Sequence, residues 1–122
     1  MIELIDEISK NPLIHIPFSV GLIFIAAGFI MFRFPPKTIN SIYGYRTTKS
    51  MESQEKWDFS QKYSSIEMMK LGLILSISSL LGFITTFNNF TNMIIGLGLM
   101  LLMVITLIWR VEKAIKEKFK NN

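Results

Sequence analysis

Three long apolar runs, at residues 12–32, 68–87 and 90–109, constrain this chain more than any other feature of its sequence. The only Asp, Glu, Lys or Arg within them is Lys70. A helix rises about 1.5 Å per residue, so about 20 residues cross a hydrocarbon core about 30 Å thick. A soluble bundle would show a charged helix face, and a transmembrane barrel would alternate polar and apolar residues. Neither pattern is present, so we predict an all-α membrane protein with three transmembrane helices.

The composition agrees with a small membrane domain and excludes several kinds of site. Half of the 122 residues are hydrophobic, which is high for a soluble domain, and the length favours one domain over residues 1–122. The chain has no cysteine, so disulfides and thiolate catalysis are excluded. Its single histidine, His15, excludes a multi-histidine metal cluster, and we expect neither a metal site nor a cofactor.

Basic residues are distributed unevenly around the three runs. Twelve of the 13 lie between the first two runs, at the start of the second or after the third, and only Lys10 lies on the opposite side. Cytoplasmic flanks of membrane helices carry an excess of Lys and Arg. We therefore predict an N-terminus outside the cell, with segment 33–67 and the basic tail 110–122 in the cytoplasm. Anionic lipid headgroups, rather than nucleic acid, are the expected partners of these charges.

Small residues inside the second and third runs permit close helix contacts. The second run holds two pairs of small residues spaced four apart, Gly72 with Ser76 and Ser78 with Gly82. A tight hairpin at residues 88–89 is expected to join the second run to the third. Gly96 and Gly98 of the third run are expected to receive the second helix across this hairpin. We favour packing within one monomer, and a homo-oligomer remains open. The absence of Asp and Glu from the runs counts against a proton-coupled pump.

Segment 33–67 is the only stretch with varied polar and aromatic chemistry. Two prolines end the first helix, and the second of them, Pro36, is expected to open a short helical turn through residue 42. Ser50 is a good N-cap, and acid-before-base pairs at i,i+4 predict a helix over residues 51–65. We expect a structured cytoplasmic loop followed by a short interfacial helix that leads into the second span.

Arg46 and Asp58 are the charged residues of this segment best suited to a site. They are predicted either to pair with each other in an internal network or to bind a ligand or partner, and both interpretations remain open. An enzyme that uses them with Glu55 is disfavoured, because no histidine stands near a serine or threonine to activate it. The segment also lacks a phosphate-binding glycine loop and metal-ligand spacing. We therefore expect no catalytic residues.

The same segment resembles the signature of the SdpI family. The similar stretches are FPPKTIN at 34–40, YGYRT at 43–47, SM at 50–51 and QEKWDFSQ at 54–61. The resemblance implies a bacterial inner-membrane protein, here in a short form. It also implies immunity to a secreted peptide toxin and, as in the best-known member, signalling through a DNA-binding repressor held at the membrane. It points to eight residues that bind a partner or ligand, or build the fold: Asn40, Tyr43, Gly44, Tyr45, Arg46, Thr47, Trp57 and Asp58.

The leading hypothesis from the sequence is therefore a non-enzymatic membrane protein that gives immunity or response to a membrane-active peptide toxin. Its expected partners are the lipid bilayer, the toxin and a cytoplasmic repressor. The alternative is a small oligomeric transporter or channel subunit, which the small-residue faces would suit.

Overall fold

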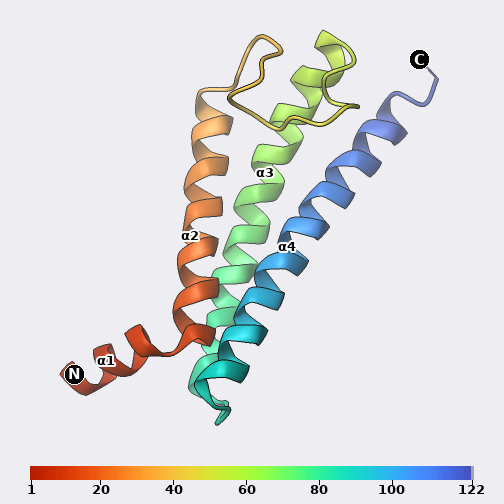
Figure 1. Ribbon diagram of the computed structural model, residues 1–122. Coiled ribbons are helices and arrows are strands. Elements are labelled where there is room, and N and C mark those ends of the chain that lie inside the picture. Colours follow the sequence, from red (N-terminus) through yellow and green to blue (C-terminus); the bar gives the residue numbers. More distant parts are fainter. Residues whose placement is uncertain (122) are drawn as a thin grey trace.

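The computed structural model describes residues 1–121, and it contains four α-helices and one short 3-10 helix. The elements are α1 (Ile2–Lys10), α2 (Pro12–Arg33), α3 (Gln54–Ser78), η1 (Ser79–Phe83) and α4 (Asn89–Lys118). In Figure 1, α2, α3 and α4 run together as a bundle, and α1 extends away from it. We call the end that carries segment 34–53 the loop end. The opposite end, with the 84–88 turn and the start of α2, is the hairpin end.

Three of these helical stretches are long and apolar enough to cross a membrane: Pro12–Arg33, Gln54–Phe83 and Asn89–Lys118. Large apolar side chains are exposed along all three, as at Phe29, Leu73 and Leu101. Such a surface is unfavourable in water and suits contact with lipid. No strand occurs in residues 1–121. The predicted all-α architecture with three spans is confirmed.

The first span begins where the sequence predicts. Pro12 occupies the first helical position, where its missing N–H costs nothing, and Asn11 is the N-cap. The Asn11 side chain accepts a hydrogen bond from the Leu13 backbone N–H at 3.0 Å and donates one to the Gly82 carbonyl at 3.2 Å. This single side chain therefore caps α2 and attaches it to η1.

The loop and the second span differ from the prediction in detail. Residues 51–65 do not form a separate interfacial helix, because α3 begins at Gln54 and continues without a break to Ser78. The predicted helical turn at residues 36–42 is irregular. Ser50 is buried, and its hydroxyl bonds to the Thr47 backbone, so it is not available as an N-cap. Ser53 caps α3 instead and accepts from the Lys56 N–H at 3.2 Å.

The third span continues as a helix beyond the apolar run 90–109. Asn88 caps α4 by accepting from the Thr91 N–H at 2.8 Å, and the helix then extends into the basic tail as far as Lys118. The turn before it covers residues 84–88, which is longer than the predicted Asn88–Asn89 hairpin. Residue 122 of the predicted tail lies outside the described residues.

Glycine brings α2 and α3 into close contact. A Cβ built on Gly21 would lie 2.5 Å from the Gly72 carbonyl oxygen and 2.7 Å from the Ser76 backbone nitrogen. The Ser76 hydroxyl also donates to the Phe18 carbonyl at 3.3 Å. The predicted pair of small residues, Gly72 and Ser76, therefore packs within the monomer.

The two glycines of the third span do not receive the second span. A Cβ on Gly96 would meet the Pro12 carbonyl of α2 at 3.0 Å, so this glycine faces the first span. A Cβ on Gly98 would meet no other atom of residues 1–121 within 4 Å. The prediction was wrong, because α4 packs against α2 as well as α3 near the hairpin end and Gly96 lies on the side that meets α2.

Candidate functional site

One face of α3 holds the loop at the loop end. Trp57 is 0% exposed, and its indole Nε1 donates to the Pro36 carbonyl at 2.7 Å. One turn further along, Gln61 donates through Nε2 to the Tyr45 carbonyl at 2.8 Å and accepts from the Tyr45 N–H at 2.7 Å. These contacts satisfy loop backbone groups that would otherwise be buried without partners. The indole and the carboxamide thus define the path of the loop.

Gly44 is the glycine that the loop requires. Its φ of +119° lies in a region that other L-residues rarely adopt. A Cβ there would lie 2.6 Å from Gln61 Oε1 and 2.8 Å from Pro36 Cγ. Backbone conformation and space therefore both demand glycine beside the Gln61–Tyr45 contact.

Asn40 and Tyr43 shape the first half of the loop. Asn40 Oδ1 accepts from the backbone N–H groups of Ile42 at 2.9 Å and Tyr43 at 2.7 Å, which forms an Asx-type turn. Its Nδ2 donates to the Thr38 carbonyl at 2.9 Å. The Tyr43 hydroxyl donates to the Phe34 carbonyl at 2.6 Å. Both side chains are therefore engaged by the backbone of the same segment.

Arg46 and Asp58 do not pair within the described residues, so this interpretation of the sequence was wrong. The Arg46 guanidinium donates to the Ser41 carbonyl. Asp58 accepts from Gln54 Nε2 at 2.8 Å, and the same amide donates to the Lys37 carbonyl at 2.7 Å. The backbone and a neighbouring amide satisfy both charged groups locally, which removes the need for an ion pair.

Tyr45 connects the loop to α4. Its ring packs against the core cluster of the loop half of the bundle, which includes Val111 and Ile115. Burial raises the pKa of its hydroxyl well above the usual range, and the negative charge of Glu112 adds to the shift. The hydroxyl is therefore a neutral donor at physiological pH. In this structure neither it nor Glu112 Oε2 makes a hydrogen bond within residues 1–121.

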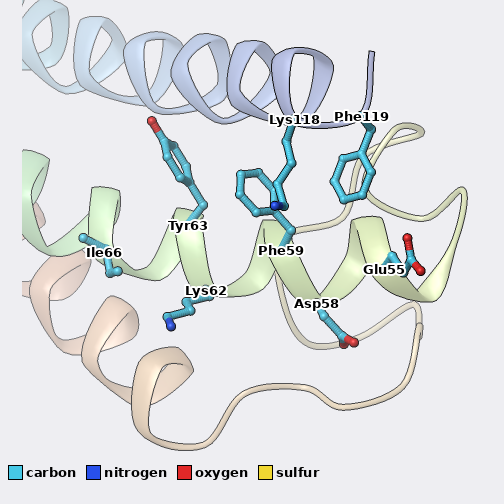
Figure 2. Close-up of a pocket in the computed structure, with 8 residues that line it drawn as sticks. All are labelled: Glu55, Asp58, Phe59, Lys62, Tyr63, Ile66, Lys118 and Phe119. Atoms are coloured by element: carbon cyan, nitrogen blue, oxygen red, sulfur yellow. The ribbon is translucent and has the colours of Figure 1, made fainter. Parts of the chain in front are cut away.

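A groove of about 770 Å³ lies between the loop-end halves of α3 and α4. Figure 2 shows aromatic rings between the two helices, and Phe59 stacks on Tyr63 at 5.6 Å and meets Phe119 edge-on at 5.8 Å between ring centroids. The ammonium of Lys118 lies 5.5 Å from the Phe59 ring. An aromatic wall with charged residues at its edge suits an amphipathic segment.

Asp58 and Lys62 lie on the side of α3 that points away from α4 in Figure 2. They line both this groove and a second one of about 580 Å³, which Met31, Phe32 and Pro36 also help to form. Of the eight residues predicted as a site, Asp58 is thus the one that borders open space on both sides. Most of the others build the loop, and Thr47 closes a turn by accepting from the Ser50 N–H at 3.2 Å.

The sequence interpretation missed an ion pair between α3 and α4. The Glu67 side chain is only 5% exposed, and its carboxylate accepts from Arg110 Nε at 2.9 Å and Nη2 at 3.2 Å. Lys70 lies 3.9 Å from the same carboxylate. A signal was present, because Glu67 and Arg110 are equally distant in sequence from the Asn88-Asn89 turn. Antiparallel helices joined there bring such positions to the same depth.

Replacing Arg110 with leucine is expected to destabilise the protein, because it leaves the Glu67 carboxylate buried without its bidentate partner. Changing Glu67 to leucine as well should recover part of the loss, since both charges are then gone. Thermal unfolding in detergent of both single variants and the double variant measures this coupling. Additive effects of the two changes would contradict a functional ion pair.

No group of three or more His, Cys, Asp or Glu residues that could hold a metal ion is present in the described part of the chain. The loop end therefore offers hydrogen-bonding amides, aromatic rings and charged edges.

Comparison with known proteins identifies the family to which the chain belongs. A match to the SdpI/YfhL protein family covers residues 37–110, which is more than half of the chain and includes most of the loop, α3, η1 and α4 up to Arg110. The chain belongs to this family. Helices α1 and α2 lie outside the matched residues.

A relative supports the same assignment. The uncharacterized protein YfhL of Bacillus subtilis (strain 168) is 45% identical over 56 residues, which cover 46% of this chain and 51% of YfhL. The chain thus spans about half the length of this curated relative. No solved structure matches the chain. SdpI/YfhL membership and the three candidate spans together establish a multi-pass membrane protein.

Proposed function

We propose that this chain is a non-enzymatic protein of the bacterial inner membrane that gives immunity or response to a membrane-active peptide toxin. The observation that carries the proposal is the SdpI/YfhL match over residues 37–110. Residues of that range supply the α3 side of the groove at the loop end, and Lys118 and Phe119 complete it from beyond the match; a groove with aromatic and charged side chains suits recognition. The small-residue face of α3 is used inside the monomer, so no observation favours an oligomeric transporter.

The loop end is the part that we place in the cytoplasm. Twelve of the 13 Lys and Arg residues lie in segment 33–67, at Lys70 or in the tail 110–122, and cytoplasmic flanks of membrane helices carry such an excess. Trp109 is 60% exposed, and the Lys113 ammonium lies 5.0 Å from its ring. An exposed indole beside a lysine suits the headgroup level of a leaflet, where anionic lipid would contact the tail. A signalling partner such as a repressor would approach from this side.

Expression in a toxin-sensitive bacterium tests the protective role. Cells that make the chain are expected to survive a higher concentration of a membrane-active peptide than cells with an empty vector. The Trp57→Ala variant, in which the loop end is expected to be disrupted, should protect less well than the wild-type chain. Equal killing with and without the chain, across a panel of such peptides, would refute immunity.

The orientation has an independent test, because the chain contains no cysteine. Single cysteines replace Ile84 in the hairpin turn and Ile42 in the loop, which are 79% and 86% exposed. A membrane-impermeant maleimide added to intact cells is expected to label I84C at once and I42C only after permeabilisation. The reverse pattern would show that the loop end faces outward.

A further inference from the structure

A polar pocket of about 340 Å³ lies at the hairpin end, far from the loop. It is formed where α1 meets α2, by the turn before α4 and by the first turn of α4. Its polar lining includes Glu7, Asn11, Thr85, Thr86, Asn89 and Asn92. Glu7 and Asn11 precede the residues of the family match, and the other four residues lie within it.

Two buried polar groups of the pocket lack partners within residues 1–121. Asn92 is 4% exposed, and its Nδ2 donates to the Phe87 carbonyl at 3.3 Å, whereas its Oδ1 accepts from no group. The Thr85 hydroxyl is also buried without a hydrogen bond. A buried acceptor that stays unpaired is destabilising, so the pocket favours an occupant that brings N–H or O–H donors.

The charge around the pocket favours a cation. Glu7 forms no ion pair within residues 1–121, and it faces the pocket from α1. Lys10 also lines the pocket, but its ammonium is bound to Asp6 at 2.8 Å. The free backbone N–H groups at the start of α4 disfavour a nearby cation electrostatically. The Asn88 cap satisfies one of them, because its side chain accepts from the Thr91 N–H. A carboxylate with amide and hydroxyl acceptors matches an ammonium or guanidinium group.

Helix α1 lies beside the pocket at the hairpin end of the bundle. It is amphipathic, with Leu4 and Ile5 exposed on one side and Glu3, Asp6 and Glu7 on its polar face. Figure 1 shows it extending away from the bundle at the hairpin end. A short helix of this kind fits the plane of a membrane surface, which is also where cationic amphipathic peptides bind.

We propose that the hairpin-end pocket recognises a primary ammonium or guanidinium group on a cationic amphipathic peptide lying at the membrane surface. This inference rests on the proposed function, because it names the part of the chain that meets the peptide. The cation sits between the Glu7 carboxylate and the oxygens of Asn92 and Thr85, and the peptide lies beside α1.

A binding measurement on the full chain in phosphatidylcholine nanodiscs tests the proposal. The probe is a fluorescent amphipathic helix built from leucine and lysine, and its lysine-acetylated form is the uncharged counterpart. Glu7→Gln is expected to weaken binding of the lysine peptide about tenfold, which corresponds to about 1.4 kcal/mol. Thr85→Val, which keeps the side-chain shape, should also weaken it. Glu3→Gln removes the same charge from the same helix outside the pocket and should leave the affinity within about twofold.

Three results would overturn the proposal. Equal weakening by Glu7→Gln and Glu3→Gln would assign the effect to general surface charge. Undiminished binding of the acetylated peptide would assign it to apolar contact. If phosphatidylethanolamine in the nanodiscs abolishes the Glu7-dependent binding, a lipid ammonium is the occupant and the peptide is excluded.

The survival test separates this inference from the proposed function. If the Glu7→Gln variant protects cells as well as the wild-type chain, the proposed function stands and the pocket assignment is wrong. A chain whose pocket binds the lysine peptide in a Glu7-dependent way, but which protects no cell, would retain the site and lose the function.

Discussion

Trp57→Ala is expected to destabilise the protein by about 3–5 kcal/mol, the usual cost of removing a fully buried indole. The substitution opens a cavity under the loop and leaves the Pro36 carbonyl without its donor. Thermal unfolding in detergent measures the loss, and limited proteolysis of segment 34–53 shows where it occurs. The loop should become susceptible to cleavage before the spans unfold.

Two controls separate the parts of this effect. Trp57→Phe keeps most of the apolar volume and removes the hydrogen bond to Pro36, so a smaller loss of about 1–3 kcal/mol is expected. Trp109→Ala removes the same side chain from an exposed position and should change stability little. Similar losses at Trp57 and Trp109 would contradict the role of the buried indole.

Gly21→Leu is expected to separate α2 from α3 and to cost about 3 kcal/mol or more, since even Gly21→Ala overpacks the contact at a typical cost of about 1–3 kcal/mol. The added Cβ would collide with the backbone of Gly72 and Ser76, and backbone atoms cannot rotate away as a side chain can. Unfolding by denaturing detergent, followed by circular dichroism, measures the difference.

Gly98→Ala is the matched control for Gly21→Ala. It adds the same methyl group at a glycine whose Cβ would meet open space. It should be neutral, or stabilising by up to about 1 kcal/mol through the higher helix propensity of alanine. If the two alanine variants were equally stable, the close approach of α2 and α3 would not be a source of stability.

The spans were predictable because their signal is local. A run of about 20 apolar residues needs no knowledge of its neighbours to indicate a membrane helix. Helix α1 was not predicted, although Ile2, Ile5 and Ile8 follow a helical pattern. A segment this short is marginal as an isolated helix, so its pattern alone carries little weight.

The loop end was predictable only as a cluster of residues. Trp57 and Gln61 are four residues apart and therefore share a helix face, but the partners of that face are backbone groups of Pro36 and Tyr45, which no side-chain spacing indicates. For the same reason a pairing of Arg46 with Asp58 was one of the two interpretations that the sequence left open, whereas in the structure the Arg46 guanidinium donates to the Ser41 backbone carbonyl. The sequence therefore indicates which side chains of the loop end can form hydrogen bonds, and the path of the backbone decides which groups they bond to.

Helix α3 is continuous from the loop contacts of Gln54 to the 3-10 turn beside the hairpin-end pocket. At about 1.5 Å per residue its 25 residues form a stiff rod about 37 Å long. A tilt imposed at one end of a stiff rod is transmitted to the other without local melting. An event at one membrane face is thus expected to displace the Trp57 and Gln61 anchors at the opposite face, with no diffusing messenger between them.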